Sequence, residues 1–197
     1  MRGVLIVFEG LDQSGKQTQA EMLQQQLQKD GRAVRLLSFP DYTTPIGTEI
    51  HRALHGEREY TPDVMQLLYV ANRFERRPSM EQALAAREIL VCDRYAASSI
   101  AYGEAQGLDA GWLAEIQRGL PEPDATILLD IDPAVAARRK AAGRDRYERD
   151  LAMLARVRDS YLRQADAGNW IRLDADRDRA IVAADILTAI GARLARR

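Results

Sequence analysis

Residues 8–19 read FEGLDQSGKQTQ, and this stretch decides the fold. Gly10, Gly15 and Lys16 have the spacing G-x4-G-K. An apolar run of five residues precedes the stretch, and a helical pattern follows it. A strand, a glycine-rich turn and a helix, in this order, are the context that a phosphate-binding P-loop requires. We therefore expect a P-loop at residues 9–18.

The chemistry of such a loop depends on backbone N–H groups, which glycines allow to turn inward around an anion next to a helix N-terminus. Lys16 would contact the β- and γ-phosphates of a bound nucleotide. Only three of the 28 basic residues are lysines, and one of them stands here. A compact ammonium fits inside the loop where a planar guanidinium would not. The residues expected to bind the nucleotide phosphates form one run: Gly10, Leu11, Asp12, Gln13, Ser14, Gly15, Lys16, Gln17 and Thr18.

The position after the lysine normally holds a Ser or Thr that binds Mg²⁺, and here it holds Gln17. Two interpretations stay open. The Gln17 amide oxygen holds Mg²⁺ directly or through water, or a carboxylate elsewhere has taken over this role. Asp93, which ends an apolar run, is the carboxylate expected near the metal. Asp130 and Asp132 compete for the role, but the Pro133 that follows favours a helix cap for them.

The composition is that of an ordinary globular protein. The chain has 197 residues, 46% hydrophobic and 29% charged, with a net charge of −1. No overall field draws such a protein to nucleic acid or to a membrane. The single cysteine, Cys92, fits a reducing compartment, and the N-terminal run Val4–Phe8 is too short for a signal peptide or a membrane span. We expect one cytoplasmic domain over residues 1–197, with neither nucleic acid nor membrane as a partner.

Short apolar runs alternate with longer helical patterns, which favours an α/β fold. The expected strands are Val4–Phe8, Val34–Phe39, Ile89–Cys92, Thr126–Ile131 and Trp170–Leu173. The expected helices are Gln17–Lys29, Pro45–Leu54, Pro62–Arg77, Ser79–Arg87, Ala110–Arg118, Pro133–Ala142, Tyr147–Gln164 and Arg179–Leu194. Together with the loop, these elements predict a P-loop NTPase fold: a five-stranded parallel sheet with helices on both faces and a short lid.

Two further stretches favour a small phosphorylatable substrate, and no Asn-Lys-x-Asp motif of a GTPase is present. In REILVCDRYAASSIAYG, residues 87–103, a strand pattern ends in Asp93 and Arg94. The carboxyl end of a parallel strand borders the ligand crevice, where Arg94 would clamp a phosphate. A surface pair of Asp93 and Arg94 is the alternative interpretation.

The second stretch is QLLYVANRFERR, residues 66–77. On a helix, one face would be apolar, formed by Leu67, Val70, Ala71 and Phe74. The opposite face would carry Tyr69, Asn72, Arg73 and Arg76. An aromatic ring with an arginine four positions on can stack on and hydrogen-bond a flat heterocycle. A solvated polar face explains the same pattern.

Five stretches in order, FEGLDQSGKQTQ, FPDY, LLYVANRFE, CDRYAASSIAYG and GRDRYE, resemble thymidylate kinase over nearly the whole chain. The resemblance implies the nucleoside-monophosphate-kinase type of P-loop fold. It also implies a homodimer and the reaction MgATP + dTMP → ADP + dTDP. The alternatives are another P-loop deoxynucleoside or nucleoside-monophosphate kinase, or a non-catalytic nucleotide-binding protein.

The resemblance also implies roles for single residues. Asp12 would contact the sugar of the acceptor, Arg94 would bridge donor and acceptor phosphates, and Asp93 would lie near magnesium. Tyr69 would stack on thymine, and Arg73 would donate a hydrogen bond to a base carbonyl. The full set expected to contact dTMP is Asp12, Phe39, Tyr69, Arg73, Arg94, Ser98 and Tyr102.

Two positions depart from the family pattern. Where some members have a catalytic arginine in the P-loop, this chain has Gln13, and where many have a phosphate-gripping arginine it has Tyr42. The arginine-rich segment 138–149, RRKAAGRDRYER, resembles the lid that closes over ATP. We expect Arg144 and Arg146 to supply the missing charge, with Arg139 in reserve. The expected catalytic set is Lys16, Arg94, Asp12, Arg144 and Arg146.

Two other patterns carry less weight. His51 and His55 have the spacing of metal ligands on one helix face, but two histidines alone do not make a zinc site, and we expect none here. The stretch DADRD, residues 174–178, follows the last expected strand. It borders the adenine or caps the next helix, and the sequence does not choose between these roles.

Overall fold

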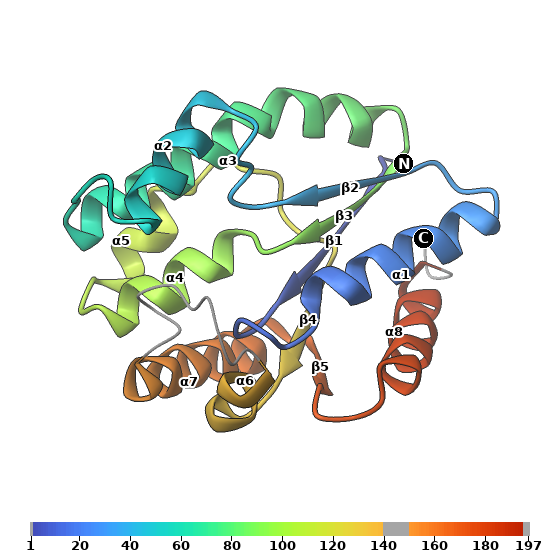
Figure 1. Ribbon diagram of the computed structural model, residues 1–197. Coiled ribbons are helices and arrows are strands. Elements are labelled where there is room, and N and C mark those ends of the chain that lie inside the picture. The colour runs from blue at the N-terminus through green and yellow to red at the C-terminus, as the bar shows by residue number, and fades with distance from the viewer. Residues whose placement is uncertain (1, 140–149, 195–197) are drawn as a thin grey trace.

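The apolar runs form one parallel sheet in the computed structural model, which describes residues 2–139 and 150–194 (Figure 1). Its strands are β1 Val4–Glu9, β2 Val34–Ser38, β3 Ile89–Asp93, β4 Ala125–Asp130 and β5 Ile171–Asp174. Their order in space is β2-β3-β1-β4-β5, and every neighbouring pair is parallel. Each end lies within one residue of its predicted position, so the predicted five-stranded parallel sheet is confirmed.

The helices in the described part of the chain alternate with these strands. They are α1 Lys16–Lys29, α2 Pro45–Leu54, α3 Pro62–Ala85, α4 Ala96–Ala105, α5 Ala110–Glu115, α6 Pro133–Arg139, α7 Leu151–Gly168 and α8 Arg179–Leu194. Helix α4 was not predicted. It consists mostly of small residues and serines, and its N-cap residue, Tyr95, makes no side-chain cap, so the usual start signal is missing. Within the described ranges, no helix has the length and apolarity needed to span a bilayer.

Helix α3 also differs from the prediction, which broke it into two helices at Pro78. It runs unbroken from Pro62 to Ala85 with Pro78 inside it. A proline in a helix interior costs about 3 kcal/mol because one hydrogen bond is lost. The turns after Pro78 bury Met80, Ala83 and Leu84 against the sheet, and burial of this apolar surface outweighs that cost.

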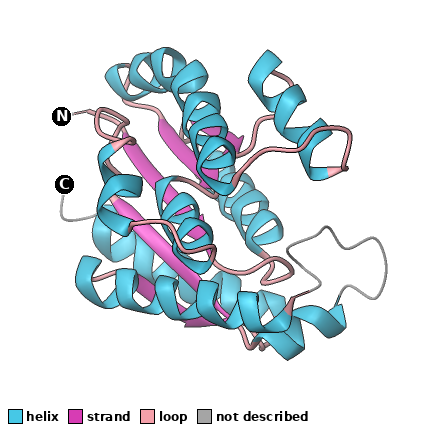
Figure 2. Ribbon diagram, turned by 90° about the vertical axis from the view of Figure 1, so that its left-hand side faces the viewer, coloured by secondary structure: helices cyan, strands magenta, loops and turns pink. Residues whose placement is uncertain are grey.

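The alternation of side chains along β1 divides the core between the two faces of the sheet. Ile6 and Phe8 pack in one cluster with residues of α1, including Leu23. Leu5 and Val7 pack in another cluster with residues of α3. Helices therefore cover both faces, as predicted, and Figure 2 shows them on both sides of the strands.

The strand order creates the place where a ligand can bind. The connection from β1 leads outward to β2, whereas the connection from β3 leads back past β1 to β4. The carboxyl ends of β1 and β3 therefore lie side by side at a topological switch point, where open α/β sheets form their ligand crevice. The two strand ends are joined directly, because Arg94 N–H donates to the Phe8 carbonyl at 2.9 Å.

The turn after β1 generates a prediction about its two glycines. Gly10 has φ 142°, and a Cβ there would lie 2.5 Å from the Leu129 carbonyl oxygen in β4. Gly15 has φ 89°, but a Cβ there would have no neighbour within 4 Å. We expect Gly15→Ala to lower the free energy of unfolding by about 1–2 kcal/mol, the cost of left-handed backbone for alanine. Gly10→Ala should lower it further because a backbone carbonyl must also move.

Urea unfolding followed by circular dichroism measures both variants against the wild type. Equal losses for the two alanine variants would contradict the close approach of Gly10 to β4.

Candidate active site

The loop between β1 and α1 has the geometry of an anion site. Helix α1 begins at Lys16, and its N-cap, Gly15, is left-handed and provides no side-chain cap. The first N–H groups of the helix therefore lack a side-chain acceptor, and the helix end favours an anion. The Lys16 side chain is 5% exposed, and its Nζ donates to the Leu11 carbonyl at 2.7 Å. Ser14 Oγ is buried and has no partner among the described residues.

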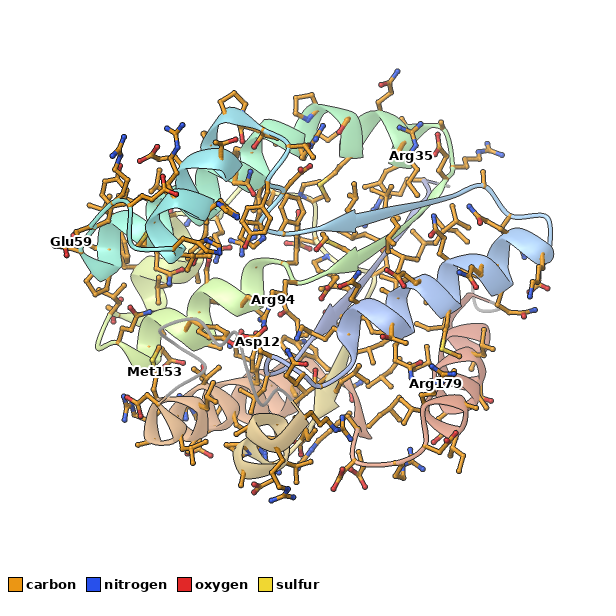
Figure 3. The ribbon with its side chains drawn as sticks, viewed as in Figure 1. Asp12, Arg35, Glu59, Arg94, Met153 and Arg179 are labelled. Atoms are coloured by element: carbon orange, nitrogen blue, oxygen red, sulfur yellow. The ribbon has the colours of Figure 1, made fainter. Side chains whose placement is uncertain are left out.

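A cluster of charged and hydroxyl groups joins this loop to the end of β3. Arg94 donates through NH2 to Asp12 Oδ1 at 2.5 Å, and the hydroxyl of Tyr102 donates to Asp12 Oδ2 at 3.0 Å. Figure 3 shows Asp12 and Arg94 next to each other at the centre of the molecule. The Arg94 guanidinium also lies over the Tyr102 ring, 5.3 Å from its centroid. The surface pair considered from the sequence is thus excluded for Arg94.

The backbone at Arg94 is unusual. Its φ is 63°, in the left-handed region that non-glycine residues rarely occupy. The surrounding structure holds this conformation through the hydrogen bond to Phe8 and through the side chain, whose NH1 donates to the Ser98 and Tyr161 hydroxyls at 3.2 and 3.3 Å. A strained residue held from several sides is typical of a functional site.

A cavity of about 120 Å³ opens beside this cluster. All seven residues expected to contact the acceptor line it: Asp12, Phe39, Tyr69, Arg73, Arg94, Ser98 and Tyr102. The sequence did not point to five other lining residues: Pro40, Leu54, Gln66, Ser99 and Gln106. Tyr42 also lines the cavity and is 45% exposed. The structure thus brings residues from the loop after β1, from α3 and from α4 together around one space.

Helix α3 was expected to have a polar face opposite its apolar face. Part of this polar face is buried. Asn72 and Arg73 are 0% and 3% exposed, whereas Leu67, expected on the apolar face, is 46% exposed. The predicted division of this helix is therefore wrong at these positions, and a solvated face does not explain Asn72 or Arg73. The reason is that both side chains find polar partners inside. Arg73 NH1 donates to Ser99 Oγ at 2.8 Å and to Gln117 Oε1 at 3.0 Å, and its Nε is buried without a partner in the described chain.

Asn72 holds the loop that carries Phe39 and Tyr42. Its Oδ1 accepts from Asp41 N–H at 2.7 Å, and its Nδ2 donates to Thr44 Oγ1 at 2.8 Å. The Phe39–Pro40 peptide in this loop is cis. Tyr42 packs edge-on against His51 at 5.4 Å, and His51 stacks on His55 at 4.0 Å. No group of three metal-ligating side chains forms around these histidines or elsewhere in the described ranges.

The electrostatics of the cluster are set by burial and by opposite charges. Burial, together with the charge of Arg94, lowers the pKa of Lys16 to about 8, although Asp12, Asp93 and Glu9 oppose this shift. Burial alone would raise the pKa of Asp12, but Arg94 and Lys16 outweigh it and hold that pKa below its usual value. Asp12 is therefore ionised at neutral pH.

The residues expected near a metal fit Mg²⁺ that is held mainly by a nucleotide. Asp93 Oδ1 is buried and has no partner among the described residues, so it is free to accept from a metal-bound water. Gln17 lies exposed in the first turn of α1, and its Nε2 donates to Glu21 at 2.9 Å. Mg²⁺ keeps several waters and takes ligands from phosphates, so a complete protein cage is not required. Asp130, the competing carboxylate, pairs with Arg158 and Arg172 instead.

Of the lid, predicted over residues 138–149, the structure describes only the start. Arg144 and Arg146 lie outside the described residues. Arg139, the reserve candidate, donates to the Gln13 carbonyl at 3.2 Å and to the Ala175 carbonyl at 2.9 Å. It therefore connects the P-loop to the stretch after β5. In that stretch Asp178 accepts from Ala180 N–H at 2.8 Å, as a helix cap does.

The residues that sequence reasoning missed are mostly buried polar side chains. Glu9 and Tyr161 share the network around Arg94, yet they are 152 positions apart. Glu9 carries a weak signal, since a carboxylate at the end of a buried strand requires partners. For Tyr161, Gln66, Ser99 and Gln117 no local pattern indicates the site.

This chain is similar to known proteins in both sequence and fold. The family model for thymidylate kinase matches residues 8–186. The thymidylate kinase of Danio rerio is 40% identical over 178 residues, which are 89% of this chain and 84% of that protein. The human thymidylate kinase is 35% identical over 187 residues, covering 94% and 88% of the two chains. A solved structure of thymidylate kinase from Candida albicans has a TM-score of 0.83 at 31% identity and covers 97% of this chain and 92% of that one. This chain therefore belongs to the thymidylate kinase family.

Proposed function

We propose that this chain transfers the γ-phosphoryl group of ATP to the phosphate of dTMP, which gives ADP and dTDP. The observation that carries the proposal is the cavity that opens beside the P-loop and is lined by both Asp12 and Arg94. A donor held by the loop and an acceptor held in the cavity would meet at Arg94. The active site would thus use one residue to contact both phosphates.

The cavity supports a pyrimidine acceptor. Arg73 has a buried Nε without a partner in the described chain, and arginine only donates hydrogen bonds. It therefore suits the carbonyl of thymine and not the amino group of cytosine. Tyr69 lines the same space and offers a ring on which the base would stack. The Tyr102 ring would lie against the 2′ position of the sugar and favour deoxyribose.

Phosphoryl transfer requires in-line positioning and stabilisation of negative charge. Lys16 and the loop amides would hold the ATP phosphates, and Arg94 would bridge donor and acceptor. The acceptor is already an anionic phosphate, so no strong general base is needed. Mg²⁺, when bound with ATP, would neutralise phosphate charge, with Asp93 holding one of its waters and Gln17 near it. Lid residues Arg144 and Arg146 would supply the charge that Gln13 does not.

We also propose a homodimer in the cytoplasm, with ATP, dTMP and Mg²⁺ as its small-molecule partners. The family resemblance supports the dimer. The free buried thiol of Cys92 is typical of a reducing compartment. The net charge of −1 gives no general attraction to nucleic acid or anionic membranes.

An assay of ADP release across dTMP, dUMP, dCMP, dGMP and thymidine tests the acceptor. We expect dTMP to have the highest kcat/KM. We expect dUMP to fall below it by roughly 10- to 200-fold, because a missing methyl is worth about 1–3 kcal/mol. Best turnover with thymidine would overturn the acceptor assignment, and ATP binding without any turnover would indicate a non-catalytic protein.

The lowered pKa of Lys16 predicts how ATP binding depends on pH. Below pH 8 the ammonium is charged and attracts phosphate, whereas above its pKa of about 8 the ligand-free protein loses this charge. The Kd for ATP, measured calorimetrically, should be level below pH 8 and then rise by up to about tenfold per pH unit. Lys16→Arg does not titrate in this range. This variant should bind ATP more weakly, and its Kd should not rise above pH 8. If the Kd of both proteins rose in the same way with pH, the role of Lys16 would be contradicted.

The lid arginines give a further prediction. Arg144→Ala and Arg146→Ala should each lower kcat by about 10²- to 10³-fold, the usual loss when one charge-stabilising donor is removed. Arg138→Ala is the matched control, because Arg138 is exposed at the end of α6, and its kcat should stay within a few-fold of wild type. If both test variants behave like this control, the lid assignment is wrong.

A further inference from the structure

A carboxylate that has no role in the proposed reaction is linked to Arg94 through two hydroxyl groups. Glu9, the last residue of β1, is 0% exposed. Its Oε1 accepts from the backbone N–H groups of Tyr95 and Ser98 at 2.9 and 3.3 Å. Its Oε2 accepts from the Ser98 hydroxyl at 2.6 Å and from the Tyr161 hydroxyl at 3.2 Å. Every donor therefore comes from α4 with its N-cap residue, or from α7.

Two of these donors belong to the start of α4. The helix has no side-chain cap from its own N-cap residue, Tyr95. Glu9, which lies on β1, caps α4 instead. Its carboxylate accepts hydrogen bonds from the N–H groups of Tyr95 and Ser98 at the start of the helix. A negative charge at a helix N-terminus is also favourable electrostatically. The contact ties the strand that precedes the P-loop to the residues that directly follow Arg94.

The other two donors are hydroxyls, and the charge of Glu9 sets their direction. A carboxylate oxygen accepts hydrogen bonds, so the Ser98 hydrogen turns toward Glu9. The Tyr161 hydrogen turns toward Glu9 or toward Ser98 Oγ, which lies 2.8 Å away, and in both cases it faces away from Arg94. The oxygen lone pairs of both hydroxyls then remain for Arg94 NH1, which lies 3.2 and 3.3 Å away. The opposite orientation would place two donors face to face, because a guanidinium has no acceptor. Glu9 thus decides whether this side of Arg94 meets acceptors.

We propose that Glu9 is a positioning residue for Arg94: through the Ser98 and Tyr161 hydroxyls it anchors NH1 and keeps NH2 aimed at Asp12 and the cavity. The inference rests on the proposed role of Arg94 in phosphoryl transfer. Asp12 holds the guanidinium directly, on the side that faces substrate. Glu9 holds it indirectly, on the side that faces the protein interior, so the group stays fixed when substrate engages NH2.

The variant that tests the proposal is Glu9→Gln, which keeps size and shape but replaces an acceptor with a donor. Its amide N–H₂ would donate to the hydroxyls and turn their hydrogens toward Arg94. We expect kcat to fall by about 10- to 100-fold, as is common when a reacting group is slightly misplaced, while KM for ATP changes little. In the Arg94→Ala background, Glu9→Gln should lower kcat by at most a few-fold, because the guanidinium that Glu9 positions is already absent.

Glu104→Gln is the matched control. Glu104 also joins α4 to α7, because it accepts from the Ser160 hydroxyl and from Arg163 at 3.2 Å. Within the described residues it has no hydrogen bond or ion pair with Arg94. The substitution removes a carboxylate that joins the same two helices and should leave kcat within a few-fold of wild type. If Glu9→Gln does not fold, Tyr161→Phe removes one of the two linking hydroxyls. It should lower kcat several-fold in the wild type and not in Arg94→Ala.

The outcomes separate this inference from the proposed role of Arg94. If Arg94→Ala keeps wild-type kcat, both the role of Arg94 and the positioning by Glu9 are overturned. If Arg94→Ala loses activity while Glu9→Gln keeps the kcat of Glu104→Gln, only the positioning fails. Additive losses in the double variant Glu9→Gln/Arg94→Ala would likewise overturn it, since Glu9 would then act without Arg94.

Discussion

The contact between the carboxyl ends of β1 and β3 is the constraint on which the site depends. The hydrogen bond from Arg94 N–H to the Phe8 carbonyl joins the two strands where both leave the sheet. This contact brings Arg94 to Asp12 across 82 positions of sequence. It also forces Arg94 into left-handed backbone, a conformation that only a well-supported turn retains. Strand order, rather than any single loop, therefore creates the crevice between the loop at residues 9–18 and the cavity around Arg94.

Opposite charges reduce the free-energy cost of burying the cations of this crevice, but they do not remove it. Lys16 is a buried cation and Arg94 is a partly buried one, and Asp12 and Glu9 supply negative charge beside them. A buried charge without a partner is strongly destabilising, whereas a hydrogen-bonded set of both signs is tolerated. The pKa of Lys16 is lowered to about 8, which shows that burial is not fully compensated for this group. A phosphate chain would supply the missing negative charge, so the same residues that cost stability when empty favour a polyphosphate ligand.

The sequence predicted those parts of the molecule that leave a local pattern. The five strands alternate with helices, and the G-x4-G-K spacing follows the first of them, so the sheet and the loop were found. The seven residues assigned to the acceptor share one cavity, although their roles stay predictions. The sequence did not predict helix α4, because the side chain that caps it, Glu9, lies on a distant strand. The sequence also did not predict that Asn72 and Arg73 are buried, because their hydrogen-bond partners lie on other elements. Helical periodicity describes one element and contains no information about such neighbours.

The central claim is that the loop at residues 9–18 and the cavity around Arg94 hold two nucleotides whose phosphates meet at that arginine. A crystal structure with dTMP and a non-hydrolysable ATP analogue tests it most directly. The account predicts the triphosphate within the loop amides and Lys16, thymine stacked on Tyr69 with a carbonyl at Arg73, and Arg94 between the phosphates. A loop without phosphate, or thymine bound away from Tyr69 and Arg73, would contradict it.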